Sequence, residues 1–299
     1  MIGALAWCDA ASLPAPTFDD LFVGDRDVIV AGAFNPTGTI APVEGGYVVS
    51  GRWAFVSGCQ HASWLYGNCV EDVVDGRPKL RAAMFDPDEV VIEDTWNVSG
   101  LSGTGSHHFH VDDVIVPAAR TFVPLVDPPC VDTAIVRIPT PALFALGIAS
   151  VAIGTARGAL DEVMRIARER VPLLEHEPVA ANPHFHYELA AADTDVRAAR
   201  ALLMEVASHA WLTATAADPF SLEQRARLRA TAVWATERAV ATVEDAYRSG
   251  GGRAVYLDSS LQRRLRDMHA LTQHFLVKRD TFTTAGAILA GQDVEVLVF

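Results

Sequence analysis

The hydrophobic pattern of the chain changes near residue 140, and this change constrains the fold more than any other feature. Between residues 28 and 125 the chain is a series of short segments that alternate or are rich in β-branched residues. Turn signals such as "EGG", "VDGRP" and "DPDE" separate them. The segments are "DVIVAGAF", "GGYVVSGRWAFVSG", "ASWLYGNCV", "LRAAMFD", "VVIEDTW" and "HHFHVDDVIV". Short strands at this spacing predict a central antiparallel β-barrel or sandwich domain over residues 28–135.

From residue 141 onward the pattern is that of long amphipathic helices. Ser221 and Gln224 form a capping box that begins one of them, and the glycines at 250–252 end it. The expected helices cover residues 141–170, 186–217, 221–252 and about 259–291. Four long helices joined by short connections predict a C-terminal four-helix bundle over residues 136–299. The fold class is therefore multidomain α and β.

The bulk composition excludes several classes of function. The chain has 299 residues, of which half are hydrophobic and 20% are charged, as in a globular protein with room for two domains. Its net charge of −13 argues against nucleic acid as a partner, because phosphate binding needs clustered Lys and Arg. No run of about 18 apolar residues predicts a membrane span. The four cysteines lack metal-ligand spacing and indicate free thiols in a reducing cytoplasm. They are Cys8, Cys59, Cys69 and Cys130.

Two segments of the β-rich half are candidates for ligand binding. In "GRWAFVSG", Trp53, Phe55 and Ser57 share one face if the segment is a strand. Two aromatic rings and a hydroxyl can flank a planar heterocycle, although aromatic residues at strand spacing more often pack in a core. In "AFNPTGT", Thr37 and the backbone N–H groups can bind the polar edge of a ligand, or the segment can be a plain turn. The residues alone leave these alternatives open.

The segment "GLSGTGSHHFHVDDVIVP" joins a glycine-rich loop to a strand. Its glycines allow a ligand to approach the backbone closely, and Thr104 and Ser106 offer hydroxyl groups. The three histidines in this segment do not predict a metal site, because neighbours on a strand point to opposite faces and no acidic residue completes a ligand set. The histidines are His107, His108 and His110.

The segment "SLQRRLRDMHALTQHF" contains two histidines five residues apart. On the expected continuous helix they point about 140° apart, so only one can face a given pocket. His274 lies in the more apolar part of the segment. It is either a general base that works near neutral pH or a core histidine with satisfied hydrogen bonds. Upstream, Arg263 and Arg266 can meet a phosphate or belong to a solvated helix start.

The order of these motifs along the chain resembles the flavin-dependent monooxygenases of the acyl-CoA dehydrogenase fold. The resemblance covers about residues 25–299. It implies a reduced flavin, usually FMN with FAD possible, that a separate flavin reductase supplies. It also implies hydroxylation of an aromatic or polycyclic small molecule by a C4a-hydroperoxyflavin. The expected protein is a cytoplasmic homotetramer or homodimer.

The resemblance also assigns roles to single residues. It places the W-x-F-x-S-G positions at the isoalloxazine ring, with the Ser57 hydroxyl near N5 and part of the catalytic site. Thr37 and Ser106 would lie near polar parts of the flavin, and Arg263 near its phosphate. His274 would be the catalytic base that deprotonates the substrate. The W-x-F-x-S-G positions are Trp53, Phe55, Ser57 and Gly58.

Three alternatives remain beside this hypothesis. A relative that oxidises acyl-CoA thioesters with FAD would use a glutamate base, whereas the region before the last helix reads "YLDSS", with only Asp258 as an acid. The same scaffold also serves N-oxygenases that act on amino sugars. In this family a helical domain precedes the strands, so residues 1–27 are expected to be the remnant of such a domain. The third alternative is a shortened, non-catalytic member of the family.

Overall fold

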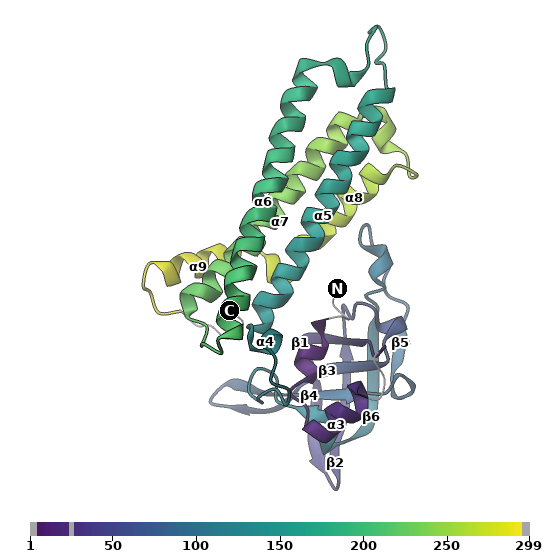
Figure 1. Cartoon of the computed structure of the whole chain (residues 1–299). Coiled ribbons are helices and arrows are strands. Elements are labelled where there is room, and N and C mark those ends of the chain that lie inside the picture. Colours follow the sequence, from purple (N-terminus) through teal and green to yellow (C-terminus); the bar gives the residue numbers. More distant parts are fainter. Residues whose placement is uncertain (1–4, 24–26, 295–299) are drawn as a thin grey trace. The chain divides into compact units, whose positions relative to one another are not determined.

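The computed structural model describes residues 5–23 and 27–294, which belong to two compact units. One unit extends to Val98 and continues with Ser102–Val136. The other contains Ser99–Leu101 and the residues from Arg137 onward. The strands lie in the first unit, here called the β-unit, and the long helices lie in the second, here called the helical unit (Figure 1). The mixed α and β content agrees with the change of pattern near residue 140.

The strands of the β-unit form one open sheet with the order β5-β6-β2-β1-β3-β4-β7. Each of the six predicted segments contains a strand, but the prediction of a barrel or sandwich is wrong because the sheet is open. The sheet is also not wholly antiparallel, since β1 runs parallel to β3. That pairing joins strands that are not consecutive, so no hairpin signal reveals it. The bounds are β1 (Val30–Val43), β2 (Gly46–Trp53), β3 (Trp64–Val74), β4 (Arg77–Phe85), β5 (Val91–Glu93), β6 (His108–Pro117) and β7 (Thr121–Phe122).

A fully buried tryptophan, Trp53, lies at the end of β2 and holds three strands together. Gly38 of β1, Gly51 of β2 and Gly67 of β3 line the slot that its ring fills, and a Cβ at any of them would clash with the ring. The indole Nε1 donates a hydrogen bond of 2.8 Å to the carbonyl of Asn68. The glycines of the "PTG" and "GRW" motifs are therefore needed for close packing of the sheet.

The other face of the sheet at β3 is covered by two short N-terminal helices, α2 (Trp7–Ala10) and α3 (Ala15–Phe22). Their apolar residues pack with Tyr66 and neighbouring strand residues. The Tyr66 hydroxyl donates a hydrogen bond of 2.9 Å to Asp9, and burial raises the pKa of Asp9 to about 7. The described part of residues 1–27 thus belongs to the β-unit, and its origin as the remnant of a helical domain stays a prediction.

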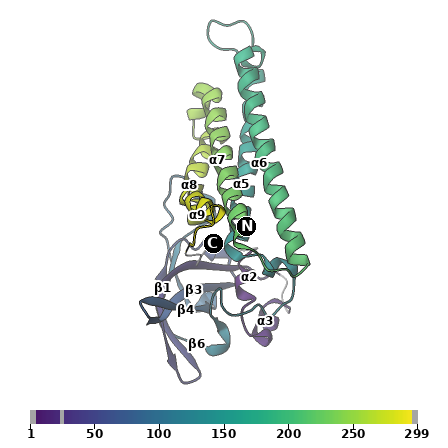
Figure 2. The same cartoon turned by 90° about the vertical axis from the view of Figure 1, so that its left-hand side faces the viewer.

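The helical unit is built on three long helices, of which α5 packs against α6 and α7, while α7 also packs against α6 (Figure 2). Helix α7 begins at the predicted capping box, in which Ser221 and Gln224 exchange hydrogen bonds of 2.8 and 3.1 Å. It ends at Gly250, as predicted, and Gly251 follows with a φ of +59°. The helix bounds are α4 (Ala134–Arg137), α5 (Thr140–Glu169), α6 (Pro183–Thr215), α7 (Leu222–Gly250), α8 (Ser260–Leu271) and α9 (Asp280–Leu289).

The predicted fourth long helix over residues 259–291 is wrong, because the chain leaves the helix after Leu271. The Thr272 hydroxyl donates a 2.7 Å hydrogen bond to the carbonyl of His269. A continuing helix would offer that carbonyl to the N–H of Gln273. Side-chain hydroxyls that compete for backbone groups favour helix ends. The result is a shorter α8, a break and then α9.

Helix α5 is long and apolar enough to cross a membrane by length and composition alone. However, 56% of its apolar window is buried inside the protein, as in the core helix of a globular domain. The cysteines named above are all unpaired, and three of them are buried.

Candidate functional site

The loop after β2 separates the two aromatic residues of the "GRWAFVSG" motif. The strand ends at Trp53, and Phe55 adopts a left-handed backbone conformation with a φ of +62°. Trp53 is therefore fully buried, whereas the Phe55 side chain is 71% exposed. The prediction that both rings share one face is wrong, because the chain turns between them. The alternative of core packing holds for Trp53, and only Phe55 offers an accessible ring.

Phe55 lies within a small group of rings, here called the aromatic patch, made of Phe55, Trp96 and His108. The Trp96 ring meets Phe55 edge-on, with 6.2 Å between centroids and an interplanar angle of 88°. The His108 ring lies 6.3 Å from Phe55 on the same measure. The three residues come from the loop after β2, the loop after β5 and the start of β6. Such a surface can contact a flat ring by stacking or edge-on.

A run of hydroxyl groups follows the aromatic patch along the loop. The Ser57 and Ser106 hydroxyl oxygens lie 2.8 Å apart, and the Thr104 hydroxyl lies 2.7 Å from that of Ser106. The N–H of Gly58 donates a 2.9 Å hydrogen bond to the carbonyl of Thr104. Three of the predicted site residues, at positions 57, 58 and 106, thus lie together. Because each hydroxyl can donate or accept, these residues can offer a ligand either a hydrogen-bond donor or an acceptor.

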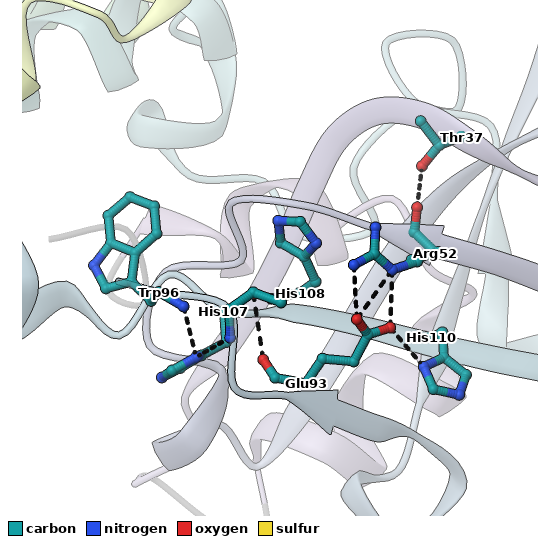
Figure 3. A network of polar contacts seen from close by, with 8 residues as sticks. Thr37, Arg52, Glu93, Trp96, His107, His108 and His110 are labelled. Atoms are coloured by element: carbon teal, nitrogen blue, oxygen red, sulfur yellow. Dashed lines mark hydrogen bonds and ion pairs between the residues drawn. The ribbon is translucent and has the colours of Figure 1, made fainter. Parts of the chain in front are cut away.

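His107 connects the two loops that carry Phe55 and Trp96. Its Nδ1 accepts hydrogen bonds from the backbone N–H groups of Thr95 at 3.2 Å and Trp96 at 3.3 Å. Its carbonyl accepts the N–H of Val56 at 3.1 Å. Figure 3 shows the ring of His107 directed at the Trp96 backbone. The sequence did not single out Trp96 or this role of His107, because both depend on contacts between loops.

Thr37 lies beside a network of charged side chains on the β-unit (Figure 3). Its hydroxyl donates a 2.7 Å hydrogen bond to the carbonyl of Arg52. The Arg52 guanidinium binds Glu93 at 2.7 and 2.9 Å, and His110 Nδ1 lies 2.8 Å from the same carboxylate. The hydrogen bond from Arg52 lowers the pKa of Glu93 to about 2. The described residues hold no group of three side chains arranged for a metal ion.

His274 lies in the helical unit, outside any long helix. It precedes the 3-10 turn η7 (Phe275–Val277), and its Nδ1 accepts a 3.3 Å hydrogen bond from the N–H of Leu276. The prediction of a helical His274, and with it the angle to His269, is wrong because α8 has already ended. His269 is exposed and lies 3.4 Å from Glu244.

Burial and a buried arginine on α7 together lower the pKa of His274. Arg229 donates a 3.3 Å hydrogen bond to the carbonyl of Leu276. Burial, and then the positive charge of Arg229, lower the pKa of His274 to about 4. Burial also lowers the pKa of Arg229 to about 10. The imidazole is therefore neutral near pH 7, and because Nδ1 accepts, its proton lies on Nε2.

The predicted phosphate contacts lie on α8. Arg263 is exposed there. Arg266 is already engaged, since it donates to the carbonyl of Ser99 at 2.8 Å and to the Gln262 side chain at 2.9 Å. Of the two arginines, only Arg263 remains a candidate for a ligand.

Known proteins are similar to this chain over both the β-unit and the helical unit. The family model "Acyl-CoA dehydrogenase, C-terminal domain" matches residues 146–279. The indole-3-acetate monooxygenase of Pseudomonas putida is 30% identical over 282 residues, which are 94% of this chain and 72% of that protein. The flavin-dependent monooxygenase oxygenase subunit HsaA of Rhodococcus jostii is 34% identical over 268 residues, which are 86% of this chain and 69% of that protein. The chain belongs to the flavin-dependent monooxygenases of the acyl-CoA dehydrogenase fold.

A solved structure extends this assignment to the fold. The 3-HSA hydroxylase from Rhodococcus sp. RHA1 matches with a TM-score of 0.89 and 27% identity, over 100% of this chain and 79% of that one. This monooxygenase family was the one that the order of motifs resembled. The resemblance is therefore confirmed.

Proposed function

We propose that the protein is the oxygenase component of a two-component system, which hydroxylates an aromatic small molecule. A separate flavin reductase supplies the reduced flavin. The names of two relatives support this proposal, since one is an oxygenase subunit and the other oxidises an indole. The observation that carries it is the Phe55 ring, held exposed beside a run of neutral hydroxyl groups.

The residues of this surface fit a flavin ring system. The aromatic patch offers apolar area, and Ser57 offers a hydroxyl that can turn to a ring nitrogen. Gly58 has a φ of +80°, which glycine adopts readily, and a Cβ there would meet nothing within 4 Å. Nδ1 of His108 is buried and has no hydrogen-bond partner in the described part of the chain. A ligand can satisfy that nitrogen. Trp53 is left out of the proposed surface because it is fully buried.

The remaining predicted contacts are proposed with narrower roles. Thr37 is exposed, and although its hydroxyl hydrogen is used by the Arg52 carbonyl, its oxygen can still accept from a ligand N–H. Arg263 is proposed to bind a phosphate of FMN or FAD. When bound, the reduced flavin supplies the chemistry that activates dioxygen. The protein binds the ring, orients it and keeps water from its surface through Phe55 and Trp96.

His274 is proposed to act on the oxygen atom of the substrate. The sequence suggests a base, and a neutral imidazole is the form that a base requires. However, a pKa of about 4 makes the neutral ring a weak base, and Nδ1 already accepts the hydrogen bond from Leu276. The proton on Nε2 can instead donate a hydrogen bond to a phenolate-like oxygen. We therefore propose that the neutral imidazole of His274 donates a hydrogen bond from Nε2 to an oxygen atom of the substrate.

An isotope experiment tests the proposed function. The protein is supplied with NADH, a flavin reductase, FMN or FAD, and ¹⁸O₂, and is given a panel of phenols together with indole-3-acetate. We expect one ¹⁸O atom in the hydroxylated product. Products without ¹⁸O, or reduction of bound FAD by an acyl-CoA, would replace the proposal with the dehydrogenase-like alternative. Oxidation at nitrogen in an amino-sugar substrate would favour the N-oxygenase alternative.

The proposal includes a cytosolic, homo-oligomeric enzyme of two or four copies. Unpaired cysteines agree with a reducing compartment. Large apolar side chains exposed along α6 agree with burial between copies, and they include Met204, Trp211 and Leu212. Sedimentation measurements would test the assembly.

A further inference from the structure

We propose that His107 is the positioning residue of the aromatic patch. Its unprotonated Nδ1 fixes the loop that carries Trp96, and its carbonyl fixes the loop that carries Phe55. The patch itself does not depend on a bound flavin, and only the effect on flavin affinity rests on the proposed function.

The orientation of the His107 ring is set by its surroundings. Nδ1 faces the consecutive amides of Thr95 and Trp96, so a flipped ring would place a C–H group against both donors. A neutral ring with its proton on Nε2 is the form that accepts both bonds. His107 is also almost completely buried, so lost hydrogen bonds would not be replaced by water.

An ion pair with Asp94 would compete with the hydrogen bonds that His107 accepts. The Asp94 carboxylate lies 3.5 Å from Nδ1, but an ion pair there would need a proton on Nδ1. That proton would remove both amide bonds. The Asp94 side chain is 98% exposed, so an ion pair with it gains little in water. We therefore assign His107 to the accepting form.

Further hydrogen bonds near His107 join the same loops. The N–H of His108 donates a 3.0 Å hydrogen bond to the Thr95 hydroxyl, which joins the same two segments again. The Val56 N–H, next to Phe55, is bound to the His107 carbonyl. One residue thus sets the distance between the loops of Phe55 and Trp96, and with it the edge-on contact of their rings.

Two variants of similar size separate the role of Nδ1 from the bulk of the ring. His107→Asn keeps an acceptor near the place of Nδ1, whereas His107→Gln moves the acceptor one bond farther from the backbone. The protein has six tryptophans, so ¹⁹F-tryptophan NMR is practical, and Trp96→Phe assigns the Trp96 signal. We expect the Asn variant to keep that signal and a reduced-flavin Kd within about threefold of wild type. The Gln variant should shift or broaden the signal and weaken binding about tenfold, as for the loss of one or two hydrogen bonds.

The outcomes separate this proposal from the proposed function. Equal behaviour of the Asn and Gln variants would overturn the role of Nδ1. If neither variant folds, ¹⁵N NMR of the wild-type His107 ring decides, because a proton on Nδ1 at neutral pH contradicts the proposal. If the wild type binds no reduced flavin but the Trp96 signal responds as expected, the proposed function fails and His107 keeps its positioning role.

Discussion

The candidate surface of the β-unit and the His274 segment of the helical unit are stabilised by different interactions. On the β-unit surface, the side chains of Ser57, Ser106 and His107 make bonds between neutral groups. In the helical unit, His274 is half-buried and its pKa responds to the charge of Arg229. Neutral hydrogen bonds fix geometry with little dependence on salt, whereas burial and a nearby charge shift the pKa of a titrating ring. The first region is suited to holding a ring, and the second to keeping an imidazole neutral.

The largest effect on the free energy of unfolding is expected from Trp53, which is fully buried beneath the β-unit surface. Trp53→Ala should lower the free energy of unfolding by about 3–5 kcal/mol, because it leaves a cavity among three strands. Phe55→Ala should change it by less than about 1 kcal/mol, since Phe55 is mostly exposed. Urea denaturation measures both. Equal losses for the two variants would mean that Phe55 belongs to the core.

The second effect is a pH dependence confined to the His274 segment. The NMR signals of the His274 ring should stay constant as the pH falls from 8 to about 5, and then shift as His274 takes up a proton with its pKa of about 4. Its pKa in the folded chain lies below the ordinary value near 6.5. The unfolded state therefore binds the proton first, and the stability that the neutral ring contributes is lost as the pH falls from about 6.5 to about 4.

Arg229 variants sharpen this prediction. In Arg229→Met the pKa of His274 should rise above 4 but stay below 6.5, because burial is the larger cause of the shift. Arg229→Lys keeps the charge and should keep the pKa low. NMR titration of the His274 ring gives both values directly. A wild-type pKa near 6.5 would contradict the account that burial and the Arg229 charge keep His274 neutral.

The smallest effect is expected within the hydroxyl run. Ser106→Ala removes contacts with Ser57 and Thr104 and should cost about 1 kcal/mol of stability. Ser102→Ala is the matched control in the same loop, because its hydroxyl makes a contact of 3.5 Å with the carbonyl of Val98, longer than those of Ser106. Thermal unfolding of the two variants measures the difference. If Ser102→Ala costs as much as Ser106→Ala, the run has no special role.

The parts of the fold that sequence predicted correctly depend on local signals. Residues Ser221 and Gln224, and the glycines after them, mark the ends of α7 without help from distant contacts. The change from strands to long helices follows from periodicity alone. The break after Leu271 has no glycine or proline to announce it, and depends on a Thr272 hydroxyl that any helix could also expose.

The candidate site was harder to predict because its residues meet across loops. The burial of Trp53 depends on glycines from three strands, and the left-handed backbone at Phe55 has no signal in a non-glycine residue. Ser57, Gly58 and Ser106 were predicted because the order of motifs resembled a known family, and their role in binding flavin stays a prediction. His107 was considered only as a metal ligand, and Trp96 was not singled out, although a tryptophan in the loop before a glycine-rich segment was a usable signal.

Binding of reduced flavin tests the account most directly, because it asks whether the exposed Phe55 ring is a ligand surface. Anaerobic titration with reduced FMN and reduced FAD would compare the wild type with Phe55→Ala and with Tyr187→Ala. Tyr187 is a matched control, since it is also 71% exposed but lies on α6. We predict that Phe55→Ala weakens binding about tenfold, as for the loss of one aromatic contact, and that Tyr187→Ala changes it by less than about twofold. Unchanged affinity in Phe55→Ala, or an equal loss in both variants, would contradict the assignment of the flavin surface.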